Sequence, residues 1–320
     1  MSPAQRLILG IKEPYLTQST QYLLKDKLAG GIILFDRNAE DREQLAALIN
    51  EILEICPEPP FIAIDFEGGR VRRLGKSFSH LGGPSEYADD LISLESHCRE
   101  IGREFKEVGI NLNLAPVVDL SYAPLNPALK DRTFSADPTR VIDYCASFYK
   151  GFSFSDIQCC LKHFPGLGSA ANDPHDKTAI SCISKERISA NDLVPFKAGI
   201  NMGINFLMTT HLLMTEIDSK ISTFSKNTID LARLIGFDKI IITDDMSMGA
   251  IGNNKSMREN VLAALIAGHD MALICHDNDK HREIVDYLES NLATLEKHGH
   301  NQALKRISDV KKELHEKYYK

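Results

Sequence analysis

The sequence predicts an α/β fold, a single-domain (β/α)8 TIM barrel. Eight short apolar segments recur along the 320 residues, and each is almost continuously apolar instead of alternating with polar residues. That pattern is typical of parallel strands whose two faces are both covered. Stretches with helical periodicity separate the segments, and eight such alternations in a chain of this length are what a (β/α)8 barrel requires.

The predicted strands are the apolar runs at residues 7–9, 31–35, 61–64, 112–118, 159–161, 206–208, 239–242 and 271–275. The predicted helices cover residues 17–29, 39–55, 91–108, 138–152, 185–202, 227–234 and 256–267. A highly charged stretch, 279–320, is expected to be a solvated helical segment that closes the barrel. An open, doubly wound sheet is the alternative, but no Gly-x-Gly-x-x-Gly follows the first strand to support it.

Composition narrows the class of protein. The chain is 43% hydrophobic and 25% charged, which is ordinary for a soluble globular protein. No linker rich in Pro, Gly or Ser interrupts it, so we expect one domain over residues 1–320. The formal charge of −7, with lysines interleaved among acids, argues against a nucleic-acid partner. The chain shows neither a secretory signal nor a run of about eighteen apolar residues, which predicts a cytoplasmic protein without a membrane partner.

The seven cysteines have no spacing typical of a metal site, and we expect reduced, mostly buried thiols.

Ionisable side chains follow most of the predicted strands. In a parallel barrel the active site lies at the carboxyl ends of the strands, so these side chains are expected to converge on one site. They are Asp65, Glu67, Arg70 and Arg73 after the third run, Asp119 after the fourth, Lys162 and His163 after the fifth, His211 after the sixth, Asp244 and Asp245 after the seventh, and His276 after the eighth.

A glycine-punctuated loop follows Lys162 and His163 and continues to His175. Polar side chains on such a loop more often serve binding or chemistry than packing. Asp173 and His175 are two residues apart, and Pro174 favours an extended conformation at Asp173. Both side chains would then lie on one side of the chain, where they could form a carboxylate–imidazole pair.

Two chemistries fit this set of residues. A metal-assisted hydrolase would use Asp244, Asp245, His163 and His211 as ligands. However, no His-x-His or His-x-x-x-His spacing is present, and the Lys162 cation would oppose metal binding. A glycosidase needs a carboxylate, a proton donor and groups that bind sugar hydroxyls, and the set satisfies that requirement better.

Three ordered motifs carry a resemblance to a known family. They are Asp65-Phe66-Glu67-Gly68-Gly69-Arg70-Val71-Arg72-Arg73, Lys162-His163-Phe164-Pro165-Gly166-x-Gly168 with Asp173-x-His175, and Thr243-Asp244-Asp245-Met246-Ser247-Met248-Gly249-Ala250. Together with Gly30–Asn38 and Ala267–Met271, they resemble the bacterial β-N-acetylglucosaminidases of glycoside hydrolase family 3. The resemblance extends from about residue 7 to about residue 280.

The resemblance implies a retaining mechanism with a covalent glycosyl–enzyme on Asp244 and no cofactor or metal. It also implies that His175, paired with Asp173, is the proton donor. The physical chemistry agrees, because an imidazole with an ordinary pKa of about 6.5 is partly protonated near neutrality and a carboxylate neighbour favours the charged form. Positions that match sugar-binding residues are Asp65, Arg73, Arg132, Lys162 and His163; His211, at a strand end, is a further candidate.

The implied reaction is exo-cleavage of a terminal β-linked N-acetylglucosamine, with cytoplasmic peptidoglycan (muropeptide) fragments as the natural substrate. We expect a monomer or weak homo-oligomer. A β-glucosidase or glycoside phosphorylase of the same family is the alternative, and a non-catalytic sugar-binding barrel is the alternative of a different class. Two positions depart from the family pattern: Leu167 replaces a histidine, and Pro174 replaces the usual serine between Asp173 and His175.

Overall fold

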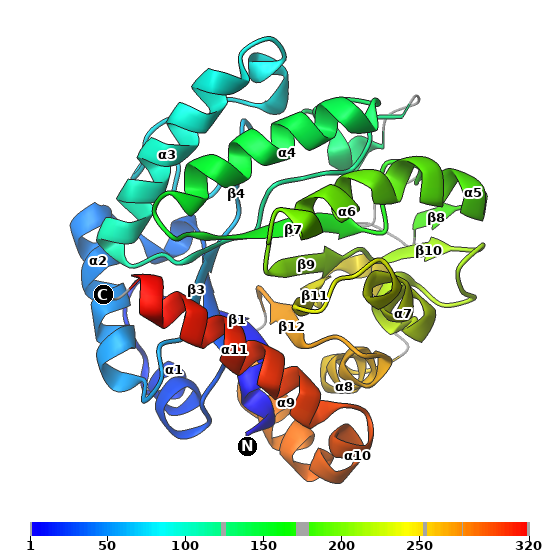
Figure 1. Ribbon diagram of the computed structural model, residues 1–320. Helices are drawn as coiled ribbons and strands as arrows, with labels where there is room; N and C mark the ends of the chain where they lie inside the picture. Colours follow the sequence, from blue (N-terminus) through cyan, green and yellow to red (C-terminus); the bar gives the residue numbers. More distant parts are fainter. Residues whose placement is uncertain (1, 123–125, 171–178, 252–254, 277, 319–320) are drawn as a thin grey trace.

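Eight parallel strands close into a barrel in the order β1-β2-β3-β6-β7-β9-β11-β12, each beside the next barrel strand along the chain (Figure 1). The structure, a computed structural model, describes residues 2–122, 126–170, 179–251, 255–276 and 278–318. The barrel strands are β1 (Leu7–Gly10), β2 (Gly31–Leu34), β3 (Phe61–Ile64), β6 (Leu112–Asn113), β7 (Gln158–Phe164), β9 (Phe206–Thr209), β11 (Ile240–Asp245) and β12 (Met271–Ile274). The predicted TIM barrel is confirmed.

Tight packing between strands explains why the runs are apolar throughout. Strand β2 pairs with β3 in register from Gly31 opposite Phe61 to Leu34 opposite Ile64, and every residue of both strands is buried. Gly31 is required at its position, because a Cβ there would lie 2.7 Å from the carbonyl oxygen of Phe61. Side chains on both faces of these strands are enclosed by protein, which favours apolar residues. Polar side chains fit only near the carboxyl ends, where they can face a cavity.

Two small sheets flank the carboxyl end of the barrel and were not predicted. Strands β4 (Phe66–Gly68) and β5 (Val71–Arg72) form an antiparallel pair directly after β3. Strands β8 (Ala179–Ser181) and β10 (Leu212–Met214) form a parallel pair. Both are short, so they carry too little periodicity to be recognised in the sequence.

Helices surround the barrel, with α3 and α4 as a long packed pair (Figure 1). Most begin at a side-chain cap: Asp41 accepts from the Gln44 amide before α2, and Asp90 from the Ser93 amide before α3. The helices are α1 (Gln18–Gln21), α2 (Arg42–Ile55), α3 (Leu91–Val108), α4 (Pro138–Ser153), α5 (Lys185–Arg187), α6 (Leu193–Asn201), α7 (Lys226–Leu234), α8 (Met257–Ala267), α9 (His281–Ser290), α10 (Leu292–Lys297) and α11 (His300–Tyr318).

Three predicted helices are interrupted. In 17–29 and 185–202, wider π-type turns at Tyr22–Asp26 and Ile188–Asp192 follow a first turn of α-helix. The charged stretch 279–320 forms α9, α10 and α11, with a turn at Gly299, whose φ is +83°. A residue other than glycine is strained at that angle.

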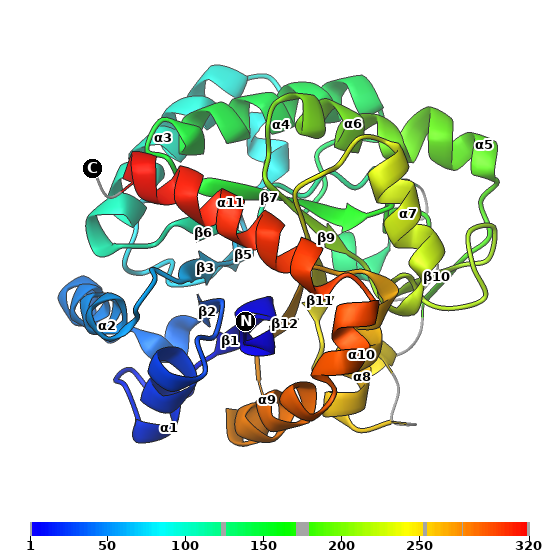
Figure 2. The same ribbon diagram turned by 60° about the horizontal axis from the view of Figure 1, so that its bottom comes forward.

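Helix α11 lies across the amino-terminal end of the barrel (red in Figures 1 and 2). Lys311 sits over the ring of Phe61 at the start of β3, 5.5 Å from its centroid, and Glu313 pairs with Lys239 at 3.2 Å. Arg306 forms a 2.7 Å ion pair with the buried carboxylate of Asp270, which immediately precedes β12. The opposite, carboxyl-terminal end is therefore the end left for a site.

All seven cysteines are free thiols, as predicted. Cys98, Cys145, Cys159, Cys160 and Cys275 are buried, Cys56 is half-buried and Cys182 is exposed. Burial raises the pKa of the Cys145 thiol to about 12 and that of Cys56 to about 11. In the described ranges, no helix combines the length and apolarity needed to cross a membrane.

Candidate active site

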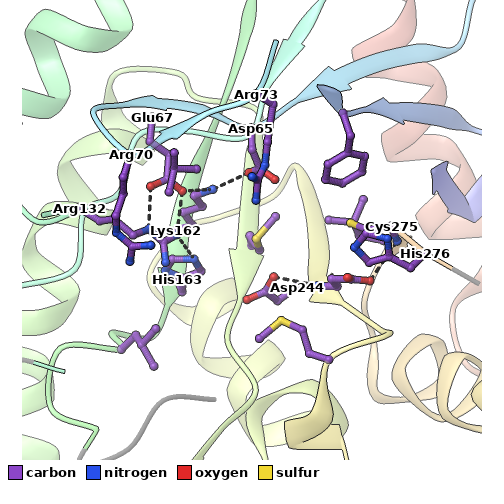
Figure 3. Close-up of a pocket in the computed structure, with 17 residues that line it drawn as sticks. Asp65, Glu67, Arg70, Arg73, Arg132, Lys162, His163, Asp244, Cys275 and His276 are labelled. Carbon is purple, nitrogen blue, oxygen red and sulfur yellow. Dashed lines mark hydrogen bonds and ion pairs between the residues drawn. The ribbon is translucent and has the colours of Figure 1, made fainter. Parts of the chain in front are cut away.

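A cavity of about 220 Å³ lies at the carboxyl ends of the barrel strands (Figure 3). This is smaller than the roughly 300–1,000 Å³ of pockets for drug-sized ligands, and it suits a single sugar ring. Its wall brings together Asp65, Arg73, Arg132, Lys162, His163 and Asp244 of the predicted site. The other lining residues are Phe35, Glu67, Arg70, Val71, Leu167, Met208, Asp245, Met248, Leu273, Cys275 and His276.

Asp244 presents its carboxylate to the cavity from near the end of β11 (Figure 3). Its Oδ1 accepts a 2.8 Å hydrogen bond from the backbone N–H of Asp245. Burial alone would raise the pKa of Asp244, but His163, His211, the Asp245 amide and Lys162 outweigh burial and hold the pKa below its ordinary value. The group is therefore an ionised carboxylate with one oxygen anchored by the backbone.

The Asp245 side chain has a structural role. Its Oδ1 accepts from the backbone N–H groups of Ser247 and Cys275, both at 3.0 Å, and its Oδ2 accepts from the Ser247 hydroxyl at 2.6 Å. These bonds fix the turn after β11 and tie it to the end of β12. The carboxylate of Asp245 thus supports the backbone that carries Asp244.

Lys162 lies between two carboxylates (Figure 3). Its Nζ is 2.8 Å from Oδ1 of Asp65 and 2.6 Å from Oε1 of Glu67. Burial alone would lower the pKa of Lys162, but Asp65 and Glu67 outweigh burial and raise it. An ammonium has three N–H groups, so two hold protein carboxylates and one is left for the cavity.

Arg132 binds Glu67 in a bidentate manner through one edge of its guanidinium. Nε donates to Oε2 of Glu67 at 2.8 Å and Nη2 to Oε1 at 2.7 Å, while Nη1 donates to the Ala128 carbonyl at 3.0 Å. Burial alone would raise the pKa of Glu67, but Arg132 and Lys162 outweigh it and hold the pKa well below its ordinary value. Glu67 is therefore a permanent anion at neutral pH.

His163 is oriented by a buried carboxylate. Its Nδ1 is 2.7 Å from Oδ2 of Asp119, whose Oδ1 also accepts from the backbone N–H of Leu167 at 2.6 Å. On the other side of the ring, Nε2 is 3.3 Å from Nη2 of Arg132. Because a guanidinium only donates, Nε2 accepts in this arrangement.

Arg73 follows β5 and is anchored through its backbone N–H to the carbonyl of Asp65 at 3.0 Å. Its guanidinium lies 5.8 Å from the ring centroid of Phe35, and its Nε is buried without a hydrogen-bond partner in the described ranges. Arg73 is therefore a cation that retains a donor for a ligand.

His211 does not line the cavity. The side chain is fully buried between β9 and β10, where Nδ1 faces the hydroxyl of Thr223 and Nε2 lies 2.9 Å from the Asp245 carbonyl oxygen. Both ring nitrogens are engaged by protein groups, so His211 supports the strand end that carries Asp244 instead of facing a ligand.

Asp173, Pro174 and His175 lie outside the described residues. The residues on either side of segment 171–178 make specific contacts. Gly168 packs against Leu120, where a Cβ would lie 2.0 Å from the carbonyl oxygen, and the Asn126 amide donates to the Ala170 carbonyl at 3.1 Å. The hydroxyls of Ser169 and Ser181 are 2.7 Å apart, so the two ends of the segment are held close together.

Sequence reasoning missed the tasks of Glu67 and Asp119. Both were visible only as acids at strand ends, yet each holds a cavity residue in place. The spacing of Glu67, two residues after Asp65, was an available signal, because alternate residues of an extended segment share a face. No comparable signal points from Asp119 to His163. Within the described part of the chain, no group of three His, Cys, Asp or Glu side chains is placed to hold a metal ion.

The family model described as "Glycosyl hydrolase family 3 N terminal domain" matches residues 8–310. A β-hexosaminidase of Stenotrophomonas maltophilia is 34% identical over 280 residues, covering 84% of this chain and 83% of that protein. Native NagZ from Neisseria gonorrhoeae superimposes with a TM-score of 0.81 at 29% identity, covering 89% of this chain and 84% of NagZ.

A family 3 β-N-acetylglucosaminidase from Paenibacillus superimposes with a TM-score of 0.90 at 27% identity, covering 99% of this chain and 62% of that one. The family model spans nearly the whole barrel, and the relatives agree with it in sequence and in fold. The chain belongs to glycosyl hydrolase family 3 and is a glycoside hydrolase.

Proposed function

We propose that the enzyme is a retaining exo-β-N-acetylglucosaminidase that forms a covalent glycosyl–enzyme on Asp244. The observation that carries the proposal is the ionised Asp244 carboxylate, which faces Lys162, His163 and Arg132 across a cavity the size of one sugar ring. Fixed N–H donors and a carboxylate are the groups that bind sugar hydroxyls, and a carboxylate beneath the ring is the nucleophile of retaining glycosidases.

The carboxylates beside Asp244 in the described cavity wall are poorly placed to act as the proton donor. Retaining glycosidases usually pair the nucleophile with a carboxylic acid. Here Glu67 is a permanent anion between Lys162 and Arg132, Asp65 is paired with Lys162, and Asp245 accepts three hydrogen bonds from the backbone and Ser247. All three carboxylates are thus committed to neighbouring protein groups, and the pKa of Glu67 is held well below its ordinary value.

We assign the acid to His175, assisted by Asp173. His175 follows Leu167, a cavity residue, by eight positions and precedes Ala179 by four. An extended chain covers about 3.5 Å per residue, so a connection of this length can reach across the cavity. The contact between Ser169 and Ser181 supports this assignment, because it joins the described chain on the two sides of the segment two residues after the cavity residue Leu167.

The proposed reaction has two steps. In the first, Asp244 attacks the anomeric carbon while the imidazolium of His175 gives its proton to the departing glycosidic oxygen. In the second, the neutral imidazole takes a proton from a water that attacks the anomeric carbon, which breaks the bond to Asp244 and releases the sugar.

Leaving-group chemistry tests the assignment. Asp244→Ala is expected to abolish cleavage of a chromogenic N-acetylglucosaminide. His175→Ala is expected to slow cleavage of substrates with alkyl leaving groups far more than those with activated phenolates, which need less protonation. The His163–Asp119 pair is the rival acid, although Nε2 of His163 faces Arg132. If His163→Ala and not His175→Ala shows the leaving-group dependence, the assignment to His175 is wrong.

Substrate class is decided by a panel of aryl β-glycosides. We expect the acetamido sugar to be preferred over glucose, and the opposite preference would support the β-glucosidase alternative. Sugar 1-phosphate formed in the presence of inorganic phosphate would indicate a phosphorylase. Binding without turnover would indicate a sugar-binding barrel. Activity lost to a chelator and restored by a metal ion would support the metal-assisted alternative, whereas we expect chelation to have no effect.

The natural substrate that we propose is a muropeptide fragment of peptidoglycan with a terminal β-linked N-acetylglucosamine, met in the cytoplasm. The resemblance to the bacterial enzymes and the similarity to NagZ support this choice. Mass spectrometry of purified muropeptides after incubation with the enzyme is expected to show loss of one N-acetylglucosamine. Unchanged muropeptides beside rapid cleavage of the aryl substrate would point to another aglycone.

A further inference from the structure

Glu67 lies buried in the cavity wall and contacts two cations that also line the cavity. The side chain is 3% exposed on β4. Its Oε1 accepts from Nζ of Lys162 at 2.6 Å and from Nη2 of Arg132 at 2.7 Å, and its Oε2 accepts from Nε of Arg132 at 2.8 Å. With three short, charge-assisted bonds, the carboxylate acts on a ligand through its partners.

The partners are left with few uncommitted donors. Lys162 uses one N–H on Glu67 and one on Asp65. Arg132 commits Nε to Glu67, shares Nη2 between Glu67 and His163, and uses Nη1 on the Ala128 carbonyl. Three N–H groups on the lysine and five on the arginine leave about one for a ligand on each. Glu67 thereby sets the direction of the donor that each cation has left.

The charges of this cluster also balance. Asp65 and Glu67 carry two negative charges, and Lys162 and Arg132 carry two positive charges. The four side chains form one connected, largely buried network. If Glu67 were uncharged, the same wall would carry a net positive charge in a setting where the attraction between charges is strong.

We infer that Glu67 is a positioning and specificity-determining residue: it aims Lys162 and Arg132 at the ligand and neutralises the wall, so that the cavity selects uncharged sugars over anionic ones. A carboxylate or phosphate that approaches Lys162 and Arg132 meets cations whose charges Asp65 and Glu67 already balance, so its lost hydration is not offset there by a net positive charge. A neutral sugar accepts hydrogen bonds from the remaining N–H groups of Lys162 and Arg132, and its desolvation costs less than that of an anionic sugar.

Because this role presupposes the sugar site of the proposed function, the test measures binding without turnover. The probes are N-acetylglucosamine as the neutral sugar, and N-acetylglucosamine 6-phosphate and N-acetylmuramic acid as anionic sugars with charges at different positions. Dissociation constants are measured by calorimetry for the wild type and three variants. Failure of the wild type to bind any of the sugars would count against the proposed function, independently of Glu67.

Glu67→Gln removes the charge and keeps the shape. We expect N-acetylglucosamine to bind about tenfold more weakly, and the ratio of anionic to neutral affinity to rise about tenfold or more for at least one anionic probe. Added salt should reduce that gain. A ratio within twofold of the wild type for both anions, in a folded variant, overturns the charge-selection role.

Glu67→Asp separates the effect of the charge from that of the position of the carboxylate. The shorter side chain keeps the negative charge but cannot contact both Lys162 and Arg132. Neutral-sugar affinity is expected to fall while the anionic-to-neutral ratio stays at the wild-type value. Unchanged neutral-sugar affinity overturns the positioning role, and this variant alone decides if Glu67→Gln does not fold. Glu313→Gln is the matched control, because Glu313 pairs with Lys239 at the far end of the barrel, and neither affinity nor ratio should change.

Discussion

The hydroxyl groups of Ser169 and Ser181 lie 2.7 Å apart although the two residues are twelve positions apart in the chain. Ser181 belongs to β8, which is held by β10, and Ser169 follows the glycine turn after β7. This contact joins the described chain on the two sides of segment 171–178. In the proposed mechanism the segment carries the acid, so the contact matters for how often His175 reaches the leaving oxygen.

Ser181→Ala removes one half of this contact. A hydrogen bond of this kind contributes about 1 kcal/mol, which corresponds to roughly a fivefold effect. We expect kcat for an alkyl N-acetylglucosaminide to fall about fivefold, while kcat for an activated aryl substrate stays within twofold. Steady-state kinetics on the two substrates measure the difference. Equal losses on both would mean that the contact supports the cavity in general and not the acid.

Asp192→Asn is expected to stabilise the protein at neutral pH. Asp192 is buried below Gly166, accepts from the Tyr122 hydroxyl at 3.1 Å and has an oxygen, Oδ1, with no hydrogen-bond partner in the described ranges. Burial raises its pKa to about 6. The folded protein thus binds this proton more tightly than the unfolded chain, and the free energy of unfolding falls as pH rises from about 4 to 6.

The neutral amide avoids that loss. Urea unfolding at pH 7 should show a gain on the order of 2 kcal/mol for Asp192→Asn, and little gain at pH 4.5. Asp218→Asn is the control, for which we expect a change in stability of opposite sign. The Ser225 hydroxyl and neighbouring amides lower the pKa of Asp218, so removing this carboxylate should lower the free energy of unfolding at pH 7. A less stable Asp192→Asn at pH 7 would contradict the expectation.

Asp244 should remain ionised at pH values where the proton donor is already fully charged. Its pKa is held below the ordinary value of about 3.9. For an activated aryl substrate, kcat/KM is therefore expected to stay flat from neutrality down to about pH 5. Lys162→Met removes one of the stabilising charges and should move the acid limb upward. An acid limb near pH 6 in the wild type with this substrate would show that Asp244 is not stabilised as described.

Asp270→Asn should destabilise the far end of the barrel and leave catalysis intact. The buried carboxylate holds Arg233 and Arg306 at 2.7 Å and accepts from the Ile241 amide at 2.7 Å, which joins α7, α11 and β11. Breaking a buried ion pair costs about 3–5 kcal/mol. Urea unfolding should show a loss of this order, with kcat/KM unchanged at a temperature where the variant is folded.

The control for Asp270 is Lys305→Ala, which removes an exposed i,i+4 pair with Asp309 on the same helix. It should change stability by less than about 0.5 kcal/mol. If Asp270→Asn is as mild as this control, the carboxylate does not tie α11 to the barrel.

The barrel could be predicted because burial on both faces leaves a clear mark, a run without polar residues. The predicted strand boundaries were least accurate at the carboxyl ends of the strands, where polar side chains face the cavity. Strand β7 continues to Phe164, past the predicted end at Leu161, because Lys162 and His163 belong to the strand and face the cavity. Strand β6 has regular pairing only at Leu112–Asn113, since Pro116 has no N–H to donate, although Val118 still donates to the Lys162 carbonyl at 2.8 Å.

The candidate site could be predicted as a set of residues but not as a network. Strand ends located Asp65, Lys162 and Asp244, because all carboxyl ends of a parallel barrel meet on one face. The position of a residue in the chain does not reveal which acidic side chain pairs with which basic one. For this reason His211 was expected to bind the ligand, whereas in the structure it contacts the Asp245 backbone carbonyl. These pairings depend on how far each side chain extends across neighbouring strands, and a single sequence does not contain that three-dimensional information.

The distribution of thiols has a practical consequence. Cys182 is the only exposed thiol among the seven cysteines, and it directly follows Ser181, whose hydroxyl contacts that of Ser169. A maleimide dye or spin label should therefore attach at this one position in the unmodified enzyme. Changes in the emission or mobility of the label on mixing with sugar would report rearrangement beside the Ser169–Ser181 contact in real time, without any engineered cysteine.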